Sequence, residues 1–107
     1  MMFVTMNRIF VSLEYAPKFE ERFRNRVHAV DEMRGFIRNL VLRPQEPEQP
    51  YVVMTFWQTE EDFKNWVNSD AFKKGHAKSG TLSKEAFSKP SHLETFETFL
   101  DTKASGD

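Results

Sequence analysis

The stretch MFVTMNRIFVSL, residues 2–13, alternates like a β-strand but places apolar side chains on both of its faces. One face holds Phe3, Thr5, Asn7, Ile9, Val11 and Leu13, and the other holds Met2, Val4, Met6, Arg8, Phe10 and Ser12. The stretch YVVMTFWQ, residues 51–58, has the same two-faced apolar character. Both stretches predict strands of a sheet that needs cover on each side.

The sequence predicts a helix between these two strands and a further strand on either side of the second one. The helix is expected over residues 17–31, because Pro17 suits a first helical turn and apolar side chains then recur at helical spacing. A strand pattern resumes in MRGFIRNLVLR, residues 33–43, and a last strand alternates in HLETFETFL, residues 92–100. The proline-rich loop that follows residue 43 cannot continue a sheet.

A second helical region begins after the strand at residues 51–58. Thr59 offers an N-cap with Asp62 three residues on, and Ser69 or Asp70 can cap a further short helix. The resulting order is β-α-β-β-α-β, which is the ferredoxin-like plan of the α+β class. Two helices on one face of a four-stranded sheet leave the other face bare, so we expect a homodimer with an isologous interface between the bare faces.

Composition restricts the classes of function. The chain has 107 residues, no cysteine and a net charge of −1, so we expect one domain over residues 1–100, no thiolate chemistry and no nucleic-acid partner. No apolar run approaches the roughly 20 residues that span a bilayer, and no signal peptide is visible, so we expect a cytoplasmic protein without a membrane partner. Residues 101–107 are expected to form a disordered tail. The eleven phenylalanines indicate an aromatic core or a cavity for a flat aromatic ligand.

Three polar or aromatic residues are candidates for a binding site. Asn7 lies on an otherwise apolar strand face, where its amide either bonds the nearby backbone or points into a pocket. His76 shares a helical face with Phe72 and is either a surface residue or a ligand. Trp66 on the preceding helix is by default a core aromatic.

Charged residues offer a weaker signal. Arg22 and Arg26 are spaced i, i+4 beside the apolar stripe that contains Phe23, as a cationic rim around an apolar pocket would be. The spacing of His28, His76 and His92 gives no reason to assemble a zinc site, and the sequence has no catalytic-triad, phosphate-loop or zinc-protease motif.

Several motifs together resemble one known family. They are NR at residues 7–8, ERFRNR at 21–26, GF at 35–36 and FKNWVNSDAFKKGH at 63–76. On these motifs the chain resembles the IsdG-type haem-degrading monooxygenases of the antibiotic biosynthesis monooxygenase (ABM) group, over about residues 2–100. The resemblance implies a ferredoxin-like domain that forms a dimeric α+β barrel.

The resemblance also implies roles for the candidate residues. His76 would be the axial ligand of the haem iron, the Asn7 amide would hydrogen-bond oxygen on the distal side, and Trp66 would press against the porphyrin. Haem b would be both cofactor and substrate, with O2 and electrons from an external donor, an unidentified reductase or reductant. The ring would open to release iron and a linear tetrapyrrole.

Further residues and two alternatives complete the expectation. Arg22, Arg26 and Phe23 match positions where the family lines or rims its haem pocket. One alternative is a cofactor-free ABM-type monooxygenase of polycyclic aromatic substrates, which would leave His76 without a role. The other is a haem-binding or carrier protein without catalytic activity, because binding residues and catalytic residues are separable.

Overall fold

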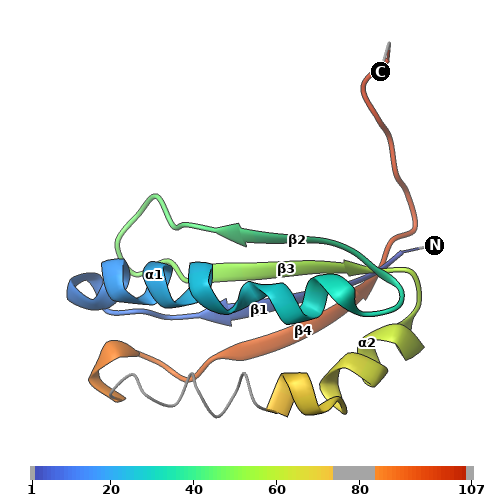
Figure 1. Ribbon diagram of the computed structural model, residues 1–107. Coiled ribbons are helices and arrows are strands. Elements are labelled where there is room, and N and C mark those ends of the chain that lie inside the picture. The colour runs from blue at the N-terminus through green and yellow to red at the C-terminus, as the bar shows by residue number, and fades with distance from the viewer. Residues whose placement is uncertain (1, 74–83, 106–107) are drawn as a thin grey trace.

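A computed structural model describes residues 2–73 and 84–105 and shows a four-stranded sheet with two helices against one of its faces (Figure 1). The strands run β2-β3-β1-β4 across the sheet, and every neighbouring pair is antiparallel. The element order confirms the predicted β-α-β-β-α-β plan of the α+β class. The main elements are β1 (Phe3–Ile9), α1 (Ala16–Arg26), β2 (Phe36–Leu42), β3 (Tyr51–Trp57), α2 (Glu60–Val67) and β4 (His92–Glu97).

Several predicted elements are shorter than expected. The strands expected over residues 33–43 and 92–100 span only Phe36–Leu42 and His92–Glu97. The strand expected over residues 2–13 ends at Ile9, because the chain then leaves β3 and pairs with the segment before β4 through Ser12 N to Ala86 O, at 2.7 Å. The helix expected over residues 17–31 is α-helical only to Arg26 and continues as a 3-10 helix over Val27–Glu32. Such tightening is common where a helix runs into a turn.

The helix-covered face of the sheet holds the core. Ile9 on β1 and Tyr51 on β3 are paired in register, and both are buried beneath Phe19 and Phe23 of α1. The ring centroids of Phe19 and Tyr51 are 4.8 Å apart, and those of Phe19 and Phe23 are 5.6 Å apart. This aromatic stack fixes α1 over one end of β1 and β3.

A helix cap and a close approach between the start of β2 and α2 fix the position of α2. The Thr59 hydroxyl accepts from the backbone N–H of Asp62 at 3.1 Å, which confirms the predicted N-cap. Ser69 caps the next helical turn by accepting from the N–H of Phe72 at 3.2 Å. Gly35 has a φ of +82°, and a Cβ there would lie 2.1 Å from the Asp62 carboxyl group. A glycine therefore lets β2 begin against the first turn of α2.

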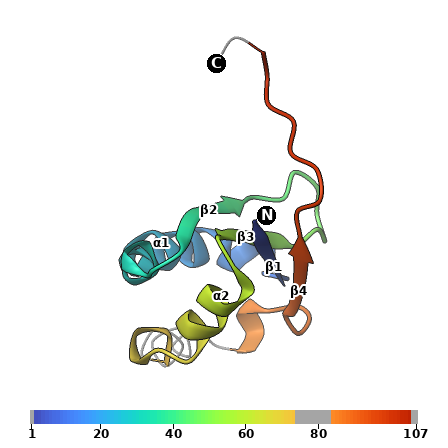
Figure 2. The same cartoon turned by 90° about the vertical axis from the view of Figure 1, so that its right-hand side faces the viewer.

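The opposite face of the sheet carries no helix among the described residues, as Figures 1 and 2 show. We call it the helix-free face. After β4 the chain leaves the body of the molecule as an extended segment with no helix or strand over residues 98–104 (Figure 2). Phe99 and Leu100 in this segment are 85% and 71% exposed. The disorder expected for residues 101–107 stays a prediction.

No helix in the described ranges, 2–73 and 84–105, has the length and apolar character to cross a membrane.

Candidate functional site

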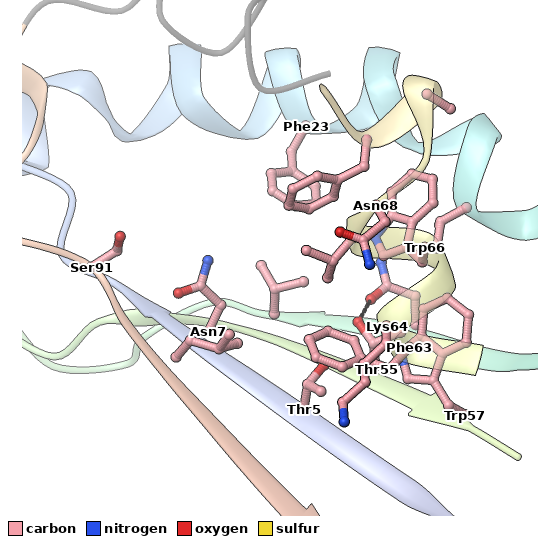
Figure 3. Close-up of a pocket in the computed structure, with 17 residues that line it drawn as sticks. Thr5, Asn7, Phe23, Thr55, Trp57, Phe63, Lys64, Trp66, Asn68 and Ser91 are labelled. Atoms are coloured by element: carbon pink, nitrogen blue, oxygen red, sulfur yellow. Dashed lines mark hydrogen bonds between the residues drawn. The ribbon is translucent and has the colours of Figure 1, made fainter. Parts of the chain in front are cut away.

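A cavity of about 540 Å³ lies between the sheet and the two helices (Figure 3). Its volume is within the range of about 300–1,000 Å³ that is typical of sites for small molecules and cofactors. The walls are mainly apolar and come from every layer of the fold. They include Phe23 from α1, Phe63 and Trp66 from α2, Phe72 from the next helical turn, Val53 from β3 and Leu93 from β4.

Asn7 projects from β1 into this cavity (Figure 3). In register it is flanked by Val53 of β3 and Leu93 of β4, so its amide lies between two apolar neighbours. No hydrogen bond joins the amide to another residue within the described ranges. Of the two interpretations of Asn7, the structure thus favours an amide that points into a pocket.

Trp66 enters the same cavity from α2 (Figure 3). Its ring meets Phe72 edge to face, with centroids 5.5 Å apart and planes at 82°. The Trp66 carbonyl accepts from the Ser69 hydroxyl at 2.6 Å, which holds the end of α2 against the turn that follows. The fold therefore brings Trp66 and Asn7, 59 positions apart in the chain, to opposite walls of one cavity.

The other predicted site residues have mixed outcomes. Phe23 lines the cavity, and its role in binding a cofactor stays a prediction. Arg22 is exposed on α1 and is not one of the lining residues. His76 and the side chain of Arg26 lie outside the described residues, so their roles stay predictions.

Metal ligation by several protein groups finds no support in the described part of the chain. No group of three or more His, Asp or Glu side chains there could hold a metal ion. His92 lies in register with Arg8 on the helix-free face, and its Nε2 is 3.8 Å from Glu94 Oε2. His76 and the side chain of His28 lie outside the described residues, so the expectation that the three histidines form no zinc site stays a prediction.

The floor of the cavity is formed by a set of polar residues that could not be identified from the sequence alone. Asn39, Thr55 and Thr5 form one row across β2, β3 and β1, and the Thr55 hydroxyl donates to Asn39 Oδ1 at 2.8 Å. Trp57 lies two residues beyond Thr55 on the same face and is fully buried. Its Nε1–H has no hydrogen-bond partner among the described residues, which costs about 1–3 kcal/mol if nothing else accepts it.

That row could not be found without strand register. The alternation of residues 2–13 places Thr5 and Asn7 on one face. Asn39 and Thr55 join them only because β2 pairs with β3 in this register, and a slip of one residue would move them to the other face.

An ion-pair cluster fixes α1, and with it Phe23, relative to the sheet. Glu20 on α1 accepts two hydrogen bonds from Arg43, at 2.6 and 2.7 Å, and one from the Tyr51 hydroxyl at 2.5 Å. The hydrogen bonds from Arg43, followed by that from Tyr51, lower the pKa of Glu20 from 4.5 to about 2. Burial and then the bond to Glu20 raise the pKa of Tyr51 to about 12.

Glu20→Gln is expected to destabilise the fold and to flatten its response to acid. A carboxylate with a lowered pKa contributes stability that is complete above about pH 4.5 and is lost as the pH falls toward 2. Arg43 is exposed, so we expect a loss of only about 1 kcal/mol at neutral pH. Chemical denaturation from pH 7 to pH 2 measures both effects.

Arg24→Gln is the matched control, because Arg24 Nη2 lies 3.5 Å from Glu20 and its side chain is 69% exposed. It should leave the acid response nearly unchanged. Indistinguishable acid unfolding of Glu20→Gln and the unaltered protein would contradict the role given to this cluster.

Comparison with known proteins places the chain among haem-binding and haem-degrading relatives. The sequence profile described as antibiotic biosynthesis monooxygenase matches residues 2–78. The chain is 36% identical over 103 residues to a heme oxygenase (mycobilin-producing) of Mycobacterium tuberculosis, covering 96% of this chain and 94% of the relative. It is 38% identical over 81 residues to a heme oxygenase (staphylobilin-producing) of Staphylococcus epidermidis, covering 74% and 77% of the two chains.

Solved structures agree with these sequence relationships. The heme-degrader MhuD from Mycobacterium tuberculosis, with two hemes bound in its active site, superposes with a TM-score of 0.75 at 34% identity, over 94% of this chain and 99% of that one. SnoaB, a cofactor-independent oxygenase from Streptomyces nogalater, superposes with a TM-score of 0.74 at 21% identity, over 94% and 95% of the two chains. At that identity the second likeness shows a shared fold alone.

Proposed function

This chain belongs to the antibiotic biosynthesis monooxygenase family, and we propose that it is a haem-degrading monooxygenase that opens the porphyrin ring. One observation carries the proposal: the fold brings Asn7 and Trp66, far apart in sequence, into one mainly apolar cavity. The relatives named heme oxygenase, at 36% and 38% identity, support the same activity.

The cavity suits haem b as substrate. Its aromatic walls offer a large apolar surface to a flat macrocycle, and Lys64 is the only charged side chain among its described lining residues. Lys64 is exposed at the rim and lies 3.5 Å from Glu60, so carboxylates of a ligand would meet positive charge only near solvent. We propose that Arg22 and Arg26 add to this positive rim.

The chain's own residues would bind the haem and orient the haem and the oxygen. His76 would hold the haem iron through an imidazole nitrogen, because it matches the position of the iron-binding histidine in the family motif FKNWVNSDAFKKGH at residues 63–76. Trp66 would pack against the ring, and the Asn7 amide would donate a hydrogen bond to oxygen in the cavity. Haem, once bound, supplies the iron that activates O2 with electrons from an external donor.

Haem titration followed by a reductant tests this function against its alternatives. The purified protein is expected to shift the Soret band on binding haem and to lose that band when ascorbate is added in air. A Soret band that persists after reduction would identify a haem carrier. No spectral change at all would favour a cofactor-free monooxygenase of polycyclic aromatic substrates.

We also propose that the protein is a homodimer formed through the helix-free face. Two charged residues of this face, Arg8 and Glu94, are joined at 2.8 Å within one protomer, and Arg38 of β2 lies on the same face. Leu42 and Phe96 are 45% and 43% exposed, an apolar surface that a second copy would cover. In register, the apolar members of the face are Val4, Met6, Leu40, Leu42, Val52, Met54, Phe56 and Phe96.

Met54→Lys is expected to convert this dimer to a monomer. Met54 is central in the face, between Met6 of β1 and Leu40 of β2, and a buried lysine without a partner is strongly unfavourable. Sedimentation at micromolar concentration measures the change. A stable monomer before substitution, or an unchanged dimer after it, would contradict the interface.

A further inference from the structure

We propose that the polar floor of the cavity is a hydrogen-bond-donating subsite for a neutral carbonyl oxygen, and that it binds the ring-opened linear tetrapyrrole in preference to the intact porphyrin. The inference rests on the proposed function and concerns the same cavity. The donor is the side-chain amide of Asn39 on β2, which lines the cavity.

The first step is the direction of the hydrogen bonds on the floor. The Thr55 hydroxyl donates to Asn39 Oδ1 at 2.8 Å, so the Asn39 amide oxygen is already engaged. Its amide nitrogen then offers N–H groups that bond no other described residue. The Nε1–H of Trp57 is also without an acceptor within the described ranges, but it is fully buried and is not presented to the cavity. The floor therefore presents the Asn39 amide as a donor that has no acceptor among the described residues.

The second step is proximity. Asn39 is paired directly with Thr55 across β2 and β3, and Trp57 is the next residue along β3 on the same face. The Asn39 amide lines the cavity that also holds Asn7, whereas Trp57 is fully buried behind it. A single ligand can therefore reach the Asn39 amide while it occupies that cavity.

The third step is the absence of positive charge on this floor. Asn39, Thr55, Thr5 and Trp57 are all uncharged, and Lys64, the charged lining residue among those described, lies at the exposed rim. A carboxylate buried on a floor without a cation is strongly disfavoured, whereas a carbonyl oxygen needs only donors. The site therefore selects a neutral acceptor.

Tetrapyrrole chemistry then separates product from substrate. In an intact porphyrin the oxygen atoms belong to the propionate carboxylates, and the ring edge has no acceptor for an N–H group. A linear tetrapyrrole has carbonyl oxygens on its terminal rings. Ring opening thus creates the group that this floor can bind, which would slow product release.

The test compares two tetrapyrroles that have the same propionates, biliverdin and iron-free protoporphyrin IX. Asn39→Leu and Asn39→Ala each remove the amide donors, the first while it keeps an apolar group of similar shape. Each is expected to weaken biliverdin binding by roughly fivefold, the effect of one hydrogen bond. Protoporphyrin binding should change less than about twofold, because the porphyrin ring edge has no acceptor for these N–H groups. Absorption titration gives both dissociation constants.

Asn65→Leu is the matched control, since Asn65 is exposed on α2 and does not line the cavity. Equal weakening of both ligands would overturn the proposal, because propionates or shape would then explain it. Unchanged biliverdin binding in both folded variants would also overturn it. If the unaltered protein binds biliverdin selectively but never degrades haem, the proposed function fails while this subsite stands.

Discussion

His76→Ala should abolish both the Soret shift on haem addition and all subsequent turnover. The chain has no cysteine to supply a thiolate, and the imidazole of His76 is the iron ligand that we propose. His76 follows the residues Ala71 and Phe72, which line the cavity, by only a few positions. Absorption spectroscopy of the haem-loaded protein measures the first effect, and decay of the Soret band after reduction measures the second.

His92→Ala is the matched control for this substitution. His92 lies on the helix-free face with a side chain that is 66% exposed, away from the cavity, so its loss should leave the haem spectrum unchanged. Imidazole added to the His76→Gly variant should restore part of the Soret shift if His76 is the ligand. An unaltered haem spectrum in His76→Ala would assign the iron to another group and remove the basis for this site.

Local patterns explain why most of the fold was predictable. The alternation in residues 51–58 and the N-cap at Thr59 act within one element, so each could be identified without knowing the neighbours. The strand expected over residues 2–13 was too long, because its end at Ile9 depends on a bridge between Val11 and Phe87. A bridge between residues so far apart in the chain cannot be predicted from local periodicity.

The same distinction applies to the candidate site, because some of its residues could be predicted from local sequence and others could not. Asn7 and Trp66 could be identified because each lies in a motif with specific spacing, and the structure brings both into the cavity. The polar floor could not, because Asn39 and Thr55 acquire a shared environment only through pairing of β2 with β3. The cluster of Glu20 and Arg43 was missed for the same reason, since it joins a helix to the end of a strand.

Asn7→Ala should leave haem binding nearly intact and lower turnover by roughly a hundredfold or more. Binding would draw on the proposed iron–imidazole bond and on burial of the ring against Phe23, Trp66 and Phe72, to which the Asn7 amide would add little. Turnover also requires that oxygen be held in one position against the ring. The amide between Val53 and Leu93 makes no hydrogen bond to any other described residue, so it is available to hold that oxygen.

Two measurements separate this role from a structural one. The haem dissociation constant should change by less than about threefold, because the Asn7 amide would bond oxygen and not the haem itself, so no hydrogen bond to haem is lost. Soret decay under fixed reductant should slow far more, so affinity and rate respond differently to one substitution. Asn65→Ala, on the exposed face of α2, should affect neither quantity. A folded Asn7→Ala protein that clears the Soret band at the unaltered rate would show that oxygen is positioned without the amide, and Trp66 would then be the residue to test.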